Sequence, residues 1–360
     1  MTSVEYKKIY INGVGNISPQ KTFDNSHFLD EPVSVESIRL KCIDPNYKEL
    51  ISGDMVRRMS RIIKMGVAAS KICLQDADCP MPDAIITGTG LGCIEDTERF
   101  LSSMILNKEE FLTPTSFIQS THNTVSAQIA LLLKCHNYNF TFVHRGISFE
   151  SALLDSLMKI NSGQAGNVLL GSADELTSNS FAILQRLGHY KRKPVNNLQL
   201  LKDHTRGSIA GEGAAFFLLS DQNNERSYAL IRDVETFIYP ENLFETILHV
   251  RDFLIRNQLS ADQIDLLITG MNGDPSTDIP YRDVSDHLFP KTGKGYFKHL
   301  CGEYHTSASF ALWLGAMILK NQEIPDVVKL QAPVNSYIKT ILIYNHYRNI
   351  NHSLILVSKA

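Results

Sequence analysis

The chain has 360 residues, of which 43% are hydrophobic and 20% are charged, and its formal net charge is −3. This composition is typical of a globular protein that is large enough to bury a substantial core. No long run of lysine and arginine supplies the basic surface that nucleic acid or an anionic membrane requires, so we expect neither as a partner.

The six cysteines are scattered, without a CxxC pair and without the spacing to histidines that a zinc site needs. They are therefore predicted to be free thiols in a reducing compartment, with no metal and no cofactor. The N-terminus lacks the pattern of a signal peptide, and no apolar run approaches the roughly 20 residues of a membrane span. We expect a cytoplasmic protein.

The first part of the chain alternates predicted strands and helices. An amphipathic helix is indicated at 55–77 by apolar residues at three- and four-residue spacings, and a second helix at 124–133. A buried strand that ends near 143 turns at Gly146 into a third helix. The other predicted strands are 8–18, 83–92, 165–175 and 206–221.

The second part repeats this theme. Helices are predicted at 243–259 and 307–321, and strands at 228–237, 264–273, 340–347 and 352–360. Strands that alternate with helices, several of them almost entirely apolar, favour a layered α/β architecture with sheets covered on both faces. Two successive α/β halves without a linker suggest a duplication, which we divide into residues 1–225 and 226–360.

Five segments in this order resemble the β-ketoacyl-acyl carrier protein synthases of the thiolase-like superfamily. They are "RRMSRIIKMGVAASKICLQDA", "IITGTGLG", "LTPTSFIQSTHNTVSAQIALLL", "NSGQAGNVLLGSADE" and "RGSIAGEGAAFFLL". The resemblance covers most of the chain and implies the layered αβαβα fold, built from two pseudo-symmetric halves.

The resemblance also implies where catalytic groups would stand. In that family a cysteine at the strand-helix elbow receives the acyl chain, because a helix N-terminus lowers the pKa of a thiol. Two histidines then stabilise the enolate that decarboxylation forms. Here the cysteine position is Gly146, and the histidine positions are Asn272 and Glu303, while the family lysine is retained as Lys298. The glycine-rich loop of the family is replaced by "YRNINHSLIL".

A ketosynthase-like chain without these groups resembles the chain-length factors of type II polyketide, aryl-polyene and flexirubin-type systems. The resemblance implies a subunit, inactive alone, that pairs with a catalytic ketosynthase as a heterodimer and shapes the acyl or polyene cavity of polyketide or fatty acid biosynthesis. An acyl carrier protein would bind through that complex. The candidates for the cavity wall or interface are Phe117, His144, Arg145, Ile147, Ser148 and Phe149.

Two other functions remain open at this point. Ser148, with His144 as its base, would make the chain a stand-alone acyltransferase or thioesterase, although a serine in a first helical turn is more often a cap. The chain would otherwise be a homodimeric acyl-binding protein. Glu303 is expected to be buried and paired with Lys298.

Overall fold

The computed structural model describes residues 7–26 and 28–360. Within them, eleven strands form one sheet and two short strands form another. The strands are β1 (Ile9–Ile17), β2 (Glu36–Ser37), β3 (Ala84–Gly88), β4 (Tyr138–Phe142), β5 (Asn167–Asp174), β6 (Val195–Asn196), β7 (Gly213–Ser220), β8 (Ala229–Ile238), β9 (Leu266–Thr269), β10 (Gly293–Tyr296), β11 (Lys329–Gln331), β12 (Thr340–Tyr347) and β13 (Asn351–Ser358).

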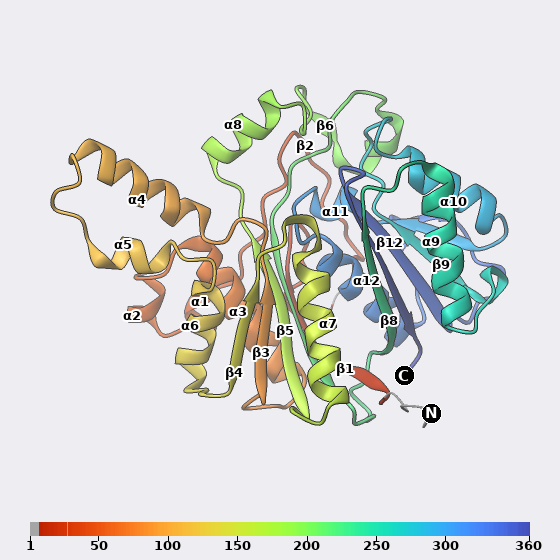
Figure 1. Cartoon of the computed structure of the whole chain (residues 1–360), viewed down its shortest axis with the longest axis horizontal. Coiled ribbons are helices and arrows are strands. Elements are labelled where there is room, and N and C mark those ends of the chain that lie inside the picture. Colours follow the sequence, from red (N-terminus) through yellow and green to blue (C-terminus); the bar gives the residue numbers. More distant parts are fainter. Residues whose placement is uncertain (1–6, 27) are drawn as a thin grey trace.

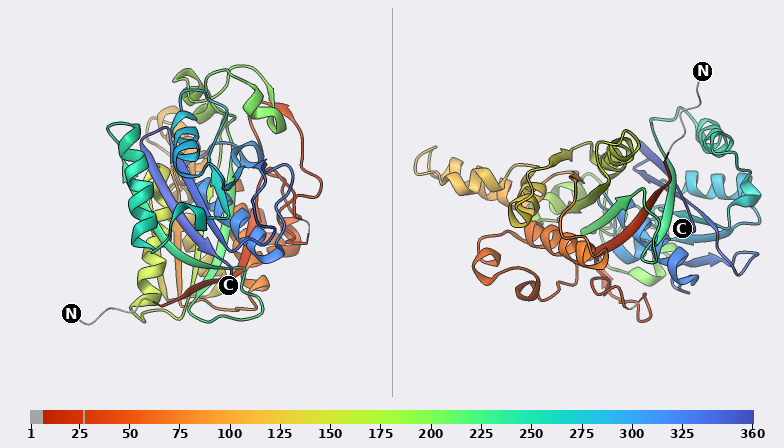
Figure 2. Two further views of the ribbon diagram at one scale, coloured as in Figure 1. Left: turned by 90° about the vertical axis from the view of Figure 1, so that its right-hand side faces the viewer. Right: turned by 90° about the horizontal axis from the view of Figure 1, so that it is seen from below.

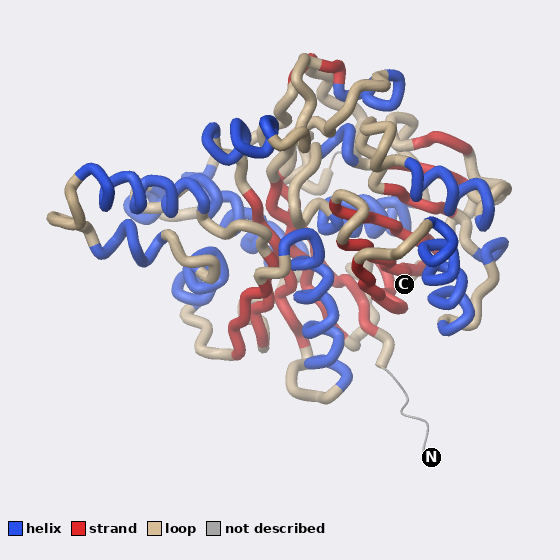
Figure 3. The backbone as a smooth tube through the Cα atoms, turned by 45° about the horizontal axis from the view of Figure 1, so that its top comes forward, coloured by secondary structure: helices blue, strands red, loops and turns tan. Residues whose placement is uncertain are grey.

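The helices lie on both faces of the sheet (Figures 1 and 3). They are α1 (Tyr47–Leu50), α2 (Gly53–Val56), α3 (Arg61–Asp76), α4 (Ile94–Leu106), α5 (Pro114–Gln119), α6 (Thr124–Leu133), α7 (Ser148–Asn161), α8 (Ser178–Arg186), α9 (Leu243–Arg256), α10 (Ile279–Leu288), α11 (Lys298–Cys301) and α12 (Ala308–Asn321). None of these helices is both long and apolar enough to span a membrane.

The large sheet repeats one strand order on either side of the pair β1–β8. Outward from β1, the order is β1-β7-β5-β3-β4, and outward from β8 it is β8-β13-β12-β9-β10. In each half the first two pairings are antiparallel and the next two are parallel. The prediction of two pseudo-symmetric α/β halves is therefore confirmed. We retain 1–225 and 226–360 as the proposed division, which falls in the connection from β7 to β8.

Successive residues of a strand face different layers because side chains alternate between the two faces of a sheet. On β3, Ile85 packs in a cluster with α3, whereas Ile86 packs with α7 and α12. On β9, Leu267 packs with α9 and α10, whereas Ile268 joins the cluster of Ile86. Helices α7 and α12 thus share a central core, with α3 and α9–α10 outside, which gives the αβαβα layering. Figure 2 shows α3 and α7 on opposite sides of the strands.

Two local predictions need correction. The helix predicted at 55–77 is divided, because Ser60 has the extended backbone conformation of an N-cap residue (φ −66°, ψ 170°) and α3 begins only after it. The strand that precedes Gly146 is not buried: β4 pairs only with β3 and forms the edge of the sheet, with exposed aromatic residues.

The segment between β3 and α6 contains two helices that were not predicted from the sequence, α4 and α5. These helices form an arm that projects from the side of the molecule where β4 lies (Figure 1). The arm has little contact with the core, and its exposed apolar residues are Leu101, Ile105, Leu106, Phe111, Phe117 and Ile118.

Candidate functional site

The elbow between β4 and α7 has no room for a side chain at Gly146. A Cβ atom at this position would overlap the Cβ atom of Tyr347 and lie 2.9 Å from its Cγ atom. Gly146 does not adopt a left-handed backbone. The left-handed residue is its neighbour Arg145, with φ 51°. Glycine is therefore required at position 146 because a side chain would overlap Tyr347, and not because of the backbone conformation.

Tyr347 was not singled out from the sequence. It ends β12, and a β-turn follows in which the nitrogen of Ile350 donates to the oxygen of Tyr347 at 3.1 Å. The central residues of this turn, Arg348 and Asn349, have φ values of 58° and 54°, as in a type I′ turn. The chain thus turns tightly without the family's glycines, and this turn holds Tyr347 over the elbow.

The Ser148 hydroxyl is bonded to the backbone of the elbow and not to a base. Its hydroxyl accepts a hydrogen bond from the backbone nitrogen of His144 at 2.7 Å and donates one to the oxygen of Arg145 at 2.8 Å. The imidazole of His144 lies against another serine, with Nδ1 3.3 Å from the Ser151 hydroxyl. The predicted pair of Ser148 with His144 as its base does not form.

The other candidates near the elbow have different environments. Phe149 is fully buried in the central core, 5.9 Å from Phe217 between ring centroids, which excludes it from an interface and leaves its role in an acyl cavity a prediction. It follows the elbow on the core-facing side of α7. Ile147 is half-buried, Arg145 is exposed, and Phe117 is 58% exposed on α5.

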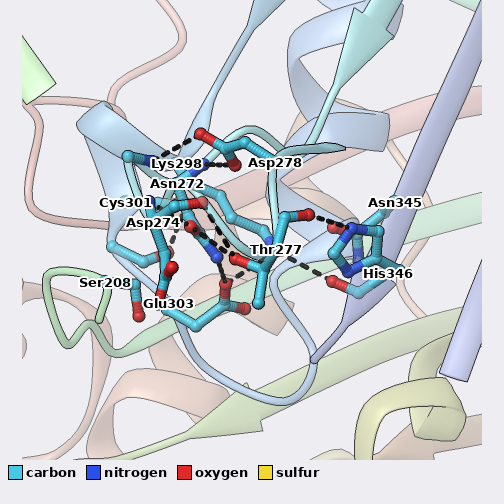
Figure 4. A network of polar contacts seen from close by, with 12 residues as sticks. Ser208, Asn272, Asp274, Thr277, Asp278, Lys298, Cys301, Glu303, Asn345 and His346 are labelled. Carbon is cyan, nitrogen blue, oxygen red and sulfur yellow. Dashed lines mark hydrogen bonds and ion pairs between the residues drawn. The ribbon is translucent and has the colours of Figure 1, made fainter. Parts of the chain in front are cut away.

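Asn272, Lys298 and Glu303, which are far apart in the sequence, form one buried polar group (Figure 4). The Oε2 atom of Glu303 accepts hydrogen bonds from Lys298 Nζ at 2.8 Å and from Asn272 Nδ2 at 2.9 Å. Lys298 Nζ also donates to the backbone oxygen of His346 at 3.1 Å. The buried pair expected from the sequence is thus present, and its two charges neutralise each other.

Local structure fixes each member of this group. Gly302 has φ 76° and lies directly against Gly211, so only glycine allows α11 to end there and place Glu303. The backbone of Glu303 is held by hydrogen bonds to Ile209 and Gly211. Asp278 accepts from the backbone nitrogens of Asn272 at 2.8 Å and Gly273 at 3.0 Å.

Asp278 was missed from the sequence, where only the aspartate-rich segment "NGDPSTD" hints at it. Burial raises the pKa of Asp278 to about 6, against the lowering effect of its two backbone hydrogen bonds. The described residues contain no group of histidine, cysteine and acidic side chains placed to hold a metal ion. The site is thus a buried, hydrogen-bonded polar cluster beside a filled elbow.

Comparison with family models matches residues 11–224 to a domain described as beta-ketoacyl synthase, N-terminal domain. The chain belongs to the β-ketoacyl synthase family. No curated protein matches it in sequence.

Several solved structures share the fold of this chain. The ishigamide ketosynthase/chain length factor has a TM-score of 0.80 at 17% identity, covering 99% of this chain and 100% of its own. A beta-ketoacyl synthase from Burkholderia phymatum has a TM-score of 0.79 at 15% identity, with coverages of 98% and 100%. A type II polyketide synthase acyl-carrier protein in complex with its ketosynthase bound to the hexaketide gives 0.73 at 15% identity, with coverages of 99% and 100%. At these identities the likeness concerns the fold.

Proposed function

We propose that this chain is the non-catalytic partner of a catalytic ketosynthase, acting as a chain-length factor. The observation that carries the proposal is the state of the three family positions. Gly146 has no nucleophile and no space for one, and Asn272 and Glu303 are bonded to each other where two histidines would act. A chain in this state cannot hold an acyl group or stabilise an enolate in the family's manner.

The edge of the sheet supports a partner of the same fold. Among the described residues, strand β4 pairs only with β3, so its outer backbone groups are open to pairing with another chain. Exposed apolar residues lie on β4 and directly after it, on α7, and on the arm helix α5. They are Tyr138, Phe140, Val143, Phe117, Ile118, Leu154 and Met158. A long apolar edge of this kind marks an interaction surface.

In the proposed heterodimer the partner supplies the nucleophile and this chain supplies part of the cavity wall. Phe117 and Ile118 on the arm, together with Ile147 at the elbow, are the residues proposed to bound the partner's acyl tunnel. Gly146 is not part of that wall, because Tyr347 covers it. The products would be polyketide or fatty acid chains, including aryl polyenes or flexirubin-type pigments, with the acyl carrier protein bound through the complex.

Affinity capture of the tagged chain from its native cell extract tests the proposal. We expect mass spectrometry to find one ketosynthase-like chain in equal amount, with its cysteine and two histidines intact. Recovery of the bait alone, as a stable homodimer, would contradict the heterodimer and favour the homodimeric acyl-binding alternative.

A pair of variants locates the interface. Phe140→Lys places a charge on the β4 edge, where the side chain is 46% exposed, and should abolish recovery of the partner. Ile238→Lys is the matched control, because Ile238 is 57% exposed on a strand of the other half. Equal recovery with both variants would show that the partner does not bind at β4.

The acyltransferase alternative has no comparable support, since the Ser148 hydroxyl is engaged by the backbone on both sides. Incubation with acyl thioesters should give no adduct on the isolated chain. An adduct that disappears in Ser148→Ala would reinstate it.

A further inference from the structure

The arm formed by α4 and α5 is joined to the body of the protein through carboxyl groups at its base. Glu98 accepts hydrogen bonds from the hydroxyl of Thr177 at 2.6 Å and from Nδ2 of Asn179 at 3.0 Å. Glu175 accepts one from the backbone nitrogen of Glu95 at 3.0 Å, in the first turn of α4. These bonds connect the arm to the segment between β5 and α8.

The rest of the arm is weakly attached within the described part of the chain. The side-chain nitrogen of Gln119, at the end of α5, donates to the backbone oxygen of Arg58 at 2.7 Å. Toward the tip the apolar side chains are exposed, with Ile105 at 75% and Phe111 at 91%. A segment that buries so little apolar surface can open without unfolding the core. The docking of the arm therefore depends on the carboxyl groups at its base.

Four carboxyl groups lie near one another at this base. Glu95 and Asp96 belong to α4, Glu175 follows β5, and Glu212 precedes β7. Glu212 is 2% exposed and Asp96 is 1% exposed, and the Oδ2 atom of Asp96 has no hydrogen-bond partner. Carboxylates that are this close and this poorly hydrated repel one another, which favours the protonated form of one of them.

The nearby cations leave Glu175 as the group without a counter-charge. Arg99 lies 3.1 and 3.3 Å from the two carboxylates of α4, and Arg61 lies 2.6 Å from Glu212. The thiol of Cys93 is also close, and burial raises its pKa, so it stays neutral. Burial raises the pKa of Glu175 from 4.5 to about 8, with a further rise from the neighbouring carboxylates and against the lowering effect of its hydrogen bond to α4.

We propose that the base of the arm is a proton-controlled hinge, in which a proton on Glu175 keeps α4 and α5 docked and its loss releases them. Ionised Glu175 places an uncompensated charge beside the other carboxylates. Opening the arm exposes Glu175 to water and moves the carboxylates of α4 away, which removes this cost. Since α5 carries Phe117 and Ile118, the hinge would also control the cavity wall of the heterodimer, and only this consequence rests on the proposed function.

The docked arm binds the proton on Glu175 more tightly than the open arm does, which fixes the direction of the pH dependence. The contribution of this proton to docking is complete below about pH 4.5 and is lost as the pH rises to about 8. Glu175 is half-buried, so solvent reduces the effect below its limit of about tenfold for each pH unit. The equilibrium constant for opening should rise about tenfold in total between about pH 6 and pH 8.

Hydrogen exchange of the full chain, followed by mass spectrometry and corrected for the intrinsic exchange rate, tests the hinge. Protection of peptides from α4 and α5 should fall about tenfold between about pH 6 and pH 8, while protection of the buried helix α12 stays constant. In Glu175→Gln the protection of the arm should not depend on pH, because glutamine accepts the same hydrogen bond without titrating. Constant protection in the wild type, or the same pH dependence in Glu175→Gln, would overturn the proposal.

Two further variants keep the test decisive if Glu175→Gln fails to fold. Asp96→Asn removes one neighbouring charge, so it should lower the pKa of Glu175 and reduce the loss of protection. Glu110→Gln is the control, because Glu110 is exposed near the tip of the arm, and it should retain the wild-type pH dependence. Equal behaviour of these two variants would contradict the hinge. Because the measurement uses this chain alone, that result would leave the capture of a ketosynthase partner as a separate question.

Discussion

The elbow and the polar group are two parts of one family site, and they have lost the family's chemistry by different physical means. At the elbow the change is steric, since Tyr347 from the far half of the chain occupies the space in front of Gly146. At the polar group the change is electrostatic, since Lys298 and Asn272 satisfy one oxygen of Glu303. The first region is closed by packing and the second is neutralised by pairing.

The two regions should therefore respond differently to substitution. Packing tolerates small losses but not additions in a filled space. A buried ion pair contributes little as a pair, yet it is very sensitive to the loss of one partner, because the remaining charge is left without compensation.

The largest effect is expected at the polar group. Lys298→Met leaves the buried carboxylate of Glu303 without its cation and removes one of the two donors to the oxygen of His346. The free energy of unfolding should fall by about 3–5 kcal/mol, measured by denaturant titration. Adding Glu303→Leu to this variant should recover most of the loss, because a buried pair can be replaced by apolar residues.

A surface pair is the control for this experiment. Lys329 Nζ lies 2.7 Å from Asp326, which is almost fully exposed, so Lys329→Met should cost about 1 kcal/mol or less. If Lys298→Met is as mild as this control, the polar group is not held by the pair.

Glu150 sharpens the comparison, because it is a buried carboxyl without a cation bonded to it. It lies in the first turn of α7, and neither carboxyl oxygen has a hydrogen-bond partner of good geometry. Burial raises its pKa from 4.5 to about 7, while the nearby Ser353 and Lys298 lower it less. The folded state therefore binds the proton more tightly than the unfolded state does.

The sign of the pH dependence follows from this shift. The contribution of Glu150 to stability is complete below about pH 4.5 and is lost as the pH rises to about 7. Because glutamine does not ionise, Glu150→Gln should not lose stability over this pH interval. The stability of the variant relative to wild type should rise by about 3 kcal/mol over that interval, measured by unfolding at a series of pH values. A difference that is independent of pH, as expected for the exposed Glu225→Gln, would show that Glu150 is not held protonated.

The sequence predicted what depends on local pattern. Apolar alternation placed most strands, and the spacing of Lys298 and Glu303 along one short segment was enough to expect their pair. The position of Tyr347 over Gly146 could not be predicted in this way, because it depends on how β12 and β13 pair in the other half of the sheet. Likewise, the left-handed backbone of Arg145 reflects the close packing of the elbow and has no signature in residue type.

The smallest expected effect is at the elbow, where Gly146→Ala adds one methyl group to the space that Tyr347 fills. It should destabilise the fold by about 1–3 kcal/mol in thermal or denaturant unfolding. Gly53→Ala is the matched control, since a Cβ there meets nothing within 4 Å, and it should be neutral. The overlap involves the Cβ atom of Tyr347, so Tyr347→Gly should relieve it and Tyr347→Ala should not. A double-mutant cycle separates this coupling from the cost of each single change. If Tyr347→Gly and Tyr347→Ala relieve the cost of Gly146→Ala equally, the aromatic ring, and not the backbone position of β12, closes the elbow.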